Sequence, residues 1–464
     1  MRHRIIITSV LIAFLSACSS APDQLSNTTN FIIIYCDDLG YGDLGCFGAE
    51  DISTPHIDRM ARDGMKFTEF YSASPVCSPS RAALLTGRIP QRMGIQGVFF
   101  PESFEGLPRE ENTIADLLQP AGYATAIVGK WHLGHMYDYL PLQRGFDEYF
   151  GIPYSNDMES VVYLEGNRVV EYHPDQSLTT KTYTEKALDF IDRKKDQPFF
   201  LYLAHSMPHV PIYASEDFLG KSERGLYGDV IQELDWSVGQ ILEKLETEEI
   251  LDKTLIIFSS DNGPWLVMKD HGGSAGELRE GKQYTFEGGQ RVPTLAMWPK
   301  TIKAGSIYSN MGLMMDWLPT FCEIAGVDLP ADRAYDGESL LKVLKGEGER
   351  EGDEFLYFDG GKLECYRKGD WKVKLPFNGF EGQIWKHAVP AHPLLLVNLK
   401  DDPGEKINLA EKYPEKLEEM LDAMEAYKAS KGDFPPPLFI RSPADDSHFE
   451  YLLETYGENY FLLE

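Results

Sequence analysis

Two short segments of the sequence are rich in side chains that can hold a metal ion. Asp37 and Asp38 lie in the first segment, and Asp261 and Asn262 lie in the second. Carboxylate and amide oxygens suit a hard cation such as Ca²⁺ or Mg²⁺, whereas a zinc site would be expected to use His or Cys. Three clustered carboxylates would repel one another without a cation. These residue types favour a metal site, although an Asp-Asp pair alone is more often a turn or a helix cap.

Cys77 lies just before a predicted helix. Ser78 is suited to be the N-cap, Pro79 the first helical residue, and Gly87 the stop. Free N–H groups and the dipole at this helix end favour negative charge near Cys77, and Arg81 can point back to the same place. The arrangement suits a nucleophile beside an anion site. Position alone favours the alternative, a structural cysteine, and generic thiol chemistry would leave the carboxylates unexplained.

The elements that must position these residues follow an alternating pattern. Apolar runs of strand length occupy residues 31–35, 124–128, 199–203, 255–258 and 294–297. Helical patterns occupy residues 55–62, 78–86, 113–119, 182–193 and 227–245. Buried strands that alternate with helices predict an α/β fold, with a large, mostly parallel sheet sandwiched by helices.

Polar residues follow four of these predicted strands. In chain order the four groups are Asp37 with Asp38, Lys130 with His132, His205 with His209, and Asp261 with Asn262. Ligands of open α/β sheets bind beyond the carboxyl ends of the strands. The four groups are therefore expected to form one active site.

The pattern changes from about residue 351 onward. Short strand-like pieces at residues 355–358, 365–367, 371–375 and 394–399 precede a helical pattern at 411–428. We therefore predict a catalytic α/β domain at residues 31–350 and a smaller subdomain with its tail at 351–464. The subdomain is expected to hold an antiparallel sheet and a helix.

The N-terminus has the features of an export signal. Arg2 and Arg4 precede an apolar run at residues 5–14, which is too short to span a bilayer. Leu15-Ser-Ala-Cys18 resembles a bacterial lipobox. The sequence predicts a lipoprotein-type signal peptide at 1–18, a tether at 19–30, and a periplasmic or cell-surface bacterial lipoprotein anchored to the membrane through a lipid on Cys18. The alternative is an ordinary cleaved signal peptide.

The overall charge narrows the range of partners. Lys plus Arg total 44 and Asp plus Glu total 73, which gives a formal net charge of −29. This balance argues against nucleic acid as a partner. An anionic substrate would need positive charge concentrated at its site.

One motif resembles a known family signature. Cys77-Ser-Pro-Ser-Arg81 followed by Leu85-Thr-Gly-Arg88 resembles the signature of the type I, formylglycine-dependent sulfatases. These belong to the alkaline phosphatase superfamily, and Ser155 matches the branch of arylsulfatase A and the N-acetylgalactosamine sulfatases. The resemblance implies that a formylglycine-generating enzyme oxidises Cys77 to formylglycine. Four cysteines would then remain besides Cys18, with their pairing open.

The resemblance extends to the other polar groups. Residues 37–46 and 260–263 resemble the family's metal motifs, which favours Ca²⁺ over Mg²⁺ and implies Asp37, Asp38, Asp261, Asn262 and the modified Cys77 as ligands. Residues 129–134 and 281–289 resemble its lysine motifs. The implied catalytic roles and substrate contacts are the following: Arg81 and Lys130 orient the formylglycine hydrate, Lys282 and His209 serve the leaving oxygen, His132 removes a proton, and Ser155, Asn156, Asp157 and His205 contact substrate. His205 has the structural alternative of a satisfied buried histidine.

Together these features predict a sulfatase that hydrolyses sulfate monoesters, R–O–SO₃⁻ to R–OH, of a sulfated small molecule or saccharide. A phosphate or phosphonate monoester hydrolase of the same superfamily is one alternative. A catalytically silent lipoprotein that binds sulfated glycan is another. A pure binder, however, needs neither His132 nor an oxidisable Cys77.

Overall fold

The computed structural model describes residues 29–158, 160–383 and 385–438. The predicted signal peptide, Cys18 and most of the tether lie outside the described residues, as does the tail from residue 439. Among the helices of the described part, none combines the length and the apolar character needed to cross a membrane.

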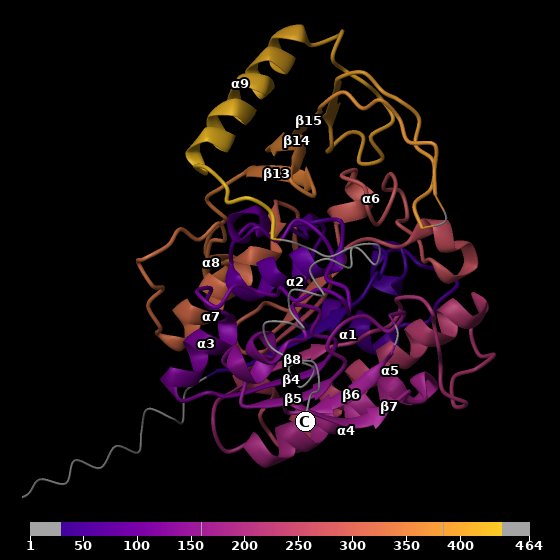
Figure 1. Ribbon diagram of the computed structural model, residues 1–464, viewed down its shortest axis with the longest axis vertical. Coiled ribbons are helices and arrows are strands. Elements are labelled where there is room, and N and C mark those ends of the chain that lie inside the picture. The colour runs from indigo at the N-terminus through magenta and orange to yellow at the C-terminus, as the bar shows by residue number, and fades with distance from the viewer. Residues whose placement is uncertain (1–28, 159, 384, 439–464) are drawn as a thin grey trace, which may run out of the picture.

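A ten-stranded sheet forms the centre of the molecule (Figure 1). Its strands, in spatial order, are β11 (Ser306–Tyr308), β2 (Met65–Phe67), β10 (Thr294–Met297), β9 (Thr254–Ser260), β1 (Asn30–Cys36), β8 (Phe199–Ala204), β4 (Ala124–Gly129), β5 (Glu148–Gly151), β6 (Val162–Glu165) and β7 (Arg168–Tyr172). Strands β9, β1, β8, β4 and β5 are mutually parallel, and only β10 and β6 run against their neighbours in this sheet. The predicted α/β class with a mostly parallel sheet is confirmed.

Helices cover both faces of this sheet. Successive side chains of a strand point to opposite faces, and every residue of β1 is buried. Phe31 and Ile33 belong to the core with α2 (Cys77–Thr86), α3 (Ile114–Leu118) and α7 (Trp317–Ala325). Ile32 and Ile34 belong to the core with α1 (Pro55–Asp63), α4 (Thr179–Lys194) and α5 (Gly225–Thr247). Burial on both faces explains why β1 reads as a continuous apolar run.

The C-terminal part forms a second, antiparallel sheet. Its strands are β13 (Glu354–Asp359), β14 (Lys362–Lys368), β15 (Trp371–Lys374) and β16 (Leu395–Asn398). Helix α9 (Pro414–Ser430) packs on one face through Met420 and Met424, and Figure 1 shows it on the outer side of the sheet. The predicted antiparallel sheet with a helix is confirmed. The remaining elements are α6 (Glu287–Gln290), α8 (Leu341–Leu344), and the pair β3 (Phe70–Tyr71) and β12 (Gly312–Leu313).

The predicted N-cap and first residue of α2 were each wrong by two residues. The helix begins at Cys77, its N-cap is Val76, and no side chain caps it. The Ser78 hydroxyl instead accepts a hydrogen bond from the Phe99 amide at 3.1 Å, so it does not serve as the cap. Gly87 ends the helix with φ of 68°, as predicted. Cys77 is therefore the first helical residue, still within the positive end of the helix dipole.

Candidate active site

Four adjacent strands end together at the site. Each neighbouring pair is joined by a backbone hydrogen bond just past the strand ends: Asp261 N to Cys36 O (3.1 Å), His205 N to Tyr35 O (2.8 Å) and Lys130 N to Ala204 O (2.7 Å). The segments that follow β9, β1, β8 and β4 thus begin side by side. The structure brings together the polar side chains that follow these four strands, as predicted, except for that of His205.

The backbone takes unusual conformations where these strands end. Asp38 and His132 have φ of 64° and 60°, values that side chains other than glycine rarely adopt. Gly129 has φ of +120°, and a Cβ there would lie 1.8 Å from the Ala204 carbonyl oxygen. Glycine is therefore required directly before Lys130. Such local strain is often found at functional sites.

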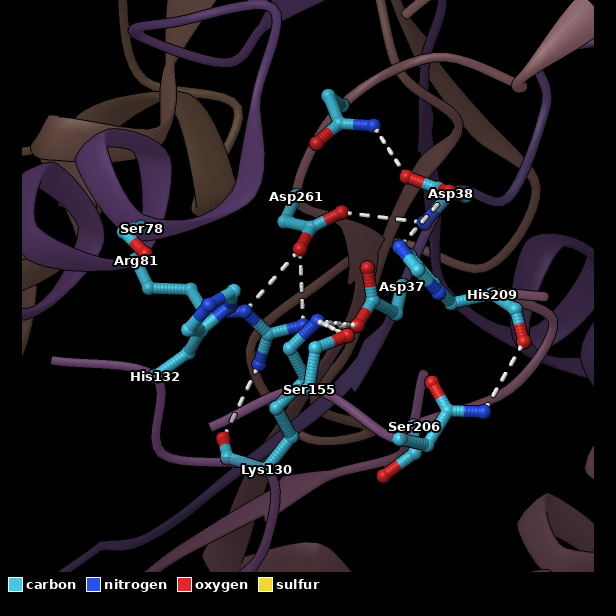
Figure 2. A network of polar contacts seen from close by, with 12 residues as sticks. Asp37, Asp38, Ser78, Arg81, Lys130, His132, Ser155, Ser206, His209 and Asp261 are labelled. Carbon is cyan, nitrogen blue, oxygen red and sulfur yellow. Dashed lines mark hydrogen bonds and ion pairs between the residues drawn. The ribbon is translucent and has the colours of Figure 1, made fainter. Parts of the chain in front are cut away.

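Asp37 is the centre of a buried network of charges (Figure 2). Its Oδ2 accepts a hydrogen bond from Lys130 and lies 3.3 Å from Arg81 Nη2. Arg81 also donates to Asp261 Oδ2 from Nε at 3.0 Å and from Nη2 at 2.8 Å. Lys130 donates to Ser155 Oγ at 2.9 Å. All four charged side chains are fully buried.

Asp38 organises the other side of the network. Asn262 Nδ2 donates to its Oδ1 at 2.7 Å, and Lys282 Nζ donates to its Oδ2 at 2.8 Å. His209 Nε2 lies 3.6 Å from the same Oδ2, and Figure 2 shows the histidine directed toward Asp38. The loops after β1, β8 and β9 and the segment before α6 therefore meet around one carboxylate.

The cations of the site stabilise the carboxylates unequally. Burial alone would raise the pKa of Asp37. The charges of Lys130, His209 and Arg81 outweigh burial, so the pKa of Asp37 lies well below its ordinary value. Burial and the charge of Asp37 together raise the pKa of Asp261 to about 7. Negative charge at Asp261 is therefore only partly compensated by the side chains present, as expected where a further cation belongs.

The donor set fits a hard cation. Ligand atoms of Asp37, Asp38 and His209 lie within 4.8 Å of one another, as do those of Asp37, Cys77 and Asp261. Asp37 Oδ1 and Asn262 Oδ1 are buried and have no hydrogen-bond partner. Buried oxygens normally have partners, so two orphaned oxygens among carboxylates point to a missing ligand. Oxygen donors of this kind suit Ca²⁺ or Mg²⁺.

Cys77 is buried against these carboxylates, with 2% of its surface exposed. Burial raises the pKa of its thiol to about 11, although Lys130 and Lys282 act in the opposite direction. Because the thiolate is the nucleophilic form of cysteine, an unmodified Cys77 is a poor nucleophile near neutral pH.

His132 has one free nitrogen. Its Nε2 lies 2.8 Å from the Phe99 carbonyl oxygen, which can only accept a hydrogen bond. Nε2 therefore carries the hydrogen and Nδ1, which is buried and unpartnered, is left as an acceptor. Burial, followed by the charges of Lys130 and Arg81, lowers the pKa of His132 well below its ordinary value. The ring is thus a neutral base in the resting site.

The predicted substrate contacts are arranged in two ways. Ser155 lies inside the network through Lys130, whereas Asp157, two residues later, is exposed. Desolvation raises the pKa of Asp157, but the charge of His209 and that of Lys130 lower it overall, so the carboxylate lies beside the site. Asn156 Nδ2 donates to the carbonyl oxygens of His209 (3.3 Å) and Pro211 (3.1 Å). Asn156 therefore holds the His209 loop in place.

His205 does not join the network. Its Nε2 lies 3.2 Å from Ser237 Oγ of α5, and its ring lies near Tyr183 of α4. Burial lowers its pKa to about 3. The His205 side chain thus contacts the helices and not the cluster, while its buried Nδ1 has no hydrogen-bond partner; its contact with substrate stays a prediction.

Sequence reasoning missed three contributors. Trp265 lies with its ring centroid 4.3 Å from Lys282 Nζ and 5.4 Å from the His209 ring centroid. Tyr202 accepts from Arg81 at 3.5 Å, and the Phe99 carbonyl orients His132. The only sequence signal for Trp265 was its place in the loop that follows Asn262.

Each of the five described cysteines is free of a disulfide.

Comparison with known proteins identifies the family. The family model Sulfatase matches residues 29–327, and the model N-sulphoglucosamine sulphohydrolase, C-terminal, matches residues 280–428. The chain is 38% identical to human N-acetylgalactosamine-6-sulfatase, over 89% of this chain and 88% of the human protein. It is 37% identical to bovine arylsulfatase A, over 87% of this chain and 88% of the bovine protein.

Two solved structures resemble most of the chain. One comes from work on the metabolism of multiple glycosaminoglycans by Bacteroides thetaiotaomicron. It has a TM-score of 0.80 and 30% identity, and the match covers 87% of this chain and all of that chain. The other, Ps i-CgsB in complex with k-i-k-neocarrahexaose, has a TM-score of 0.79 and 29% identity, and the match covers 94% of this chain and all of that chain.

Proposed function

The chain belongs to the sulfatase family and is a sulfuric ester hydrolase, and we propose that it removes sulfate from saccharides by means of a formylglycine made from Cys77 and a bound Ca²⁺. One observation carries the proposal. Cys77 lies in a single buried cluster with Asp37 and Asp261, and Arg81 and Lys130 reach the same cluster. Positive charge is concentrated there in a chain whose net charge is −29.

Formylglycine would supply what the cysteine lacks. The thiol of Cys77, with its pKa raised by burial, is mostly protonated at neutral pH. The hydrated aldehyde would provide an oxygen nucleophile toward sulfur and a second hydroxyl through which sulfate is later released. A formylglycine-generating enzyme is therefore a required partner during maturation.

Ca²⁺ would be held by Asp37, Asp38, Asp261, Asn262 and the modified residue 77. Bound there, the ion would neutralise charge on sulfate and lower the pKa of an adjacent hydroxyl. The unpartnered Oδ1 atoms of Asp37 and Asn262 support this assignment. We favour Ca²⁺ over Mg²⁺ because its coordination tolerates an irregular set of oxygen ligands.

The remaining side chains orient the nucleophile, stabilise charge or transfer protons. Arg81 and Lys130 orient the nucleophile at position 77. Lys282 and His209 stabilise or protonate the departing alcohol oxygen. Burial lowers the pKa of Lys282, but Asp38, Cys77 and Asp37 together outweigh burial and raise the pKa above its ordinary value, so the ammonium stays charged. His132, through its free Nδ1, accepts the proton whose loss releases sulfate.

The substrate is proposed to be a sulfated saccharide. The names of the relative N-acetylgalactosamine-6-sulfatase and of the carrahexaose complex support this class. Asp157 is an exposed residue whose carboxylate interacts with His209, and it offers an acceptor for sugar hydroxyls; Ser155 lies nearby inside the site. Asn156 would act by holding the His209 loop.

Paired esters of one alcohol test the reaction type. The protein, co-expressed with a formylglycine-generating enzyme, should give a higher kcat/KM for 4-nitrophenyl sulfate than for 4-nitrophenyl phosphate, and should release sulfate from N-acetylgalactosamine 6-sulfate or another sulfated saccharide of a panel. A preference for phosphate or phosphonate esters would contradict the proposal. Binding of sulfated saccharides without any hydrolysis would favour the silent glycan-binding alternative.

Export and lipid anchoring form part of the proposal. The lipobox-like Leu15-Ser-Ala-Cys18 supports a periplasmic or cell-surface lipoprotein whose lipid on Cys18 holds it to the membrane. In a bacterial host supplied with radiolabelled palmitate, the full chain should be labelled and sediment with membranes, and Cys18→Ser should lose both properties. Equal labelling of the two forms would rule out the anchor at this residue.

A further inference from the structure

A narrow hairpin of the C-terminal sheet reaches the active site. The chain between β15 and β16 folds back on itself through isolated antiparallel bridges at Phe377 with His392, Phe380 with Val389, and Gln383 with Lys386. Both backbone hydrogen bonds are present at each bridge, with N···O distances of 2.7–3.2 Å. The tip of this hairpin, which we call the 376–394 hairpin, carries Trp385.

The hairpin packs on the segment that carries Lys282. His387 Nε2 forms a hydrogen bond with the Glu280 carboxylate, and the His387 ring lies 4.9 Å from that of Tyr284. Lys386 Nζ lies 4.6 Å from the centroid of the Tyr284 ring. The hairpin tip thus contacts Glu280, two residues before Lys282, and Tyr284, two residues after it.

Two tryptophans connect the tip to the catalytic groups. Trp265 donates a hydrogen bond from its indole Nε1 to the Trp385 carbonyl oxygen at 2.7 Å. The Trp265 ring lies against Lys282 and His209, as described above, and is half-buried. The residue Trp385 is 51% exposed. The backbone of Trp385 is fixed by this hydrogen bond, but its large aromatic ring is open to solvent. Such a ring buries little surface and therefore contributes little to the stability of the fold.

We propose that Trp265 and Trp385 form an aromatic platform that binds the saccharide on the leaving-group side of the site. This inference rests on the proposed function, because Lys282 and His209 mark that side only if they serve the departing oxygen. The C–H faces of a pyranose ring are apolar and suit stacking on indole rings, and binding sites commonly combine aromatic walls with a few polar groups. Trp265 borders the sugar that carries the sulfate, and Trp385 contacts the next sugar along the chain.

Comparing short and long substrates tests the platform. Trp385→Ala should raise KM for a hexasaccharide containing N-acetylgalactosamine 6-sulfate by about 10-fold, the scale of a lost aromatic contact. Its kcat for the hexasaccharide, and its kcat/KM for 4-nitrophenyl sulfate, should stay within about twofold of wild type, because the small substrate does not reach Trp385. Trp385→Phe should restore most of the affinity. The control variant is Tyr172→Ala, at a residue of the edge strand β7 that is 69% exposed. It should leave the kinetic constants for both substrates unchanged.

A binding measurement separates this inference from the proposed function. Calorimetry with the same hexasaccharide on Cys77→Ala protein needs no turnover, and adding Trp385→Ala should weaken its affinity about 10-fold. Equal affinity with and without Trp385, failure of the hexasaccharide to bind, or equal losses on hexasaccharide and 4-nitrophenyl sulfate would each overturn the platform. Absence of any sulfate ester hydrolysis would instead contradict the proposed function, and the calorimetry would still decide about Trp385.

Discussion

Cys77→Ala protein is expected to lose sulfatase turnover by a factor on the order of 10⁴–10⁶, the range found when a catalytic nucleophile is removed. The alanine cannot be converted to formylglycine, and no other described side chain in the cluster offers an equivalent nucleophile. The fold should survive, because the change removes only one sulfur atom from a buried site and should cost on the order of 1 kcal/mol in the free energy of unfolding. Measurements of kcat on 4-nitrophenyl sulfate and of the unfolding transition check both parts.

A second buried cysteine provides the matched control. Cys322 in α7 is also nearly fully buried but lies in the apolar core and not with the carboxylates. Cys322→Ala should cost similar stability and keep the activity of the wild type. If Cys77→Ala retained substantial hydrolysis, the nucleophile would have to be another group.

Removal of the divalent cation is expected to have the next largest effect. A metal that stabilises charge on sulfate contributes several kcal/mol, so dialysis against a chelator should lower kcat by roughly 10³-fold, and Ca²⁺ should restore it. Ca²⁺ should also stabilise the fold, by about 2.7 kcal/mol at a concentration 100 times its Kd. Activity after chelation and thermal unfolding with and without Ca²⁺ measure the two effects.

Substitution of one ligand distinguishes this site from nonspecific binding to an acidic protein. Asp261→Asn should abolish the stabilisation by Ca²⁺, whereas Asp401→Asn, at an exposed turn after β16, should leave it intact. Equal stabilisation of both variants, or full activity in excess chelator, would contradict the metal assignment.

The central elements of the fold were predictable because burial leaves a clear pattern. Residues 31–35 and 255–258 read as continuous apolar runs, and both lie inside the parallel centre of the sheet as β1 and β9. Strands β2, β5, β6, β7 and β11 of this sheet were missed. They are three to five residues long, and the edge strand β7 is also mostly exposed, so that continuous apolar runs do not mark them. The antiparallel direction of β10 depends on tertiary connections that its own four residues do not encode.

The site was predictable as far as strand ends determine it. Parallel strands bring their following residues to one edge, which placed Asp37, Lys130, His209 and Asp261 together. Strand ends do not determine the direction in which a side chain points. His205 directly follows β8, but its side chain points toward α5. Contacts between distant segments, such as Trp265 with Trp385, leave no local signal at all.

The account depends most directly on the chemical state of residue 77. Mass spectrometry of the proteolytic peptide that contains it, from active protein co-expressed with a formylglycine-generating enzyme, measures that state. We predict a peptide whose mass corresponds to an aldehyde in place of the thiol side chain, in proportion to specific activity. An unmodified Cys77 in fully active protein would contradict the account.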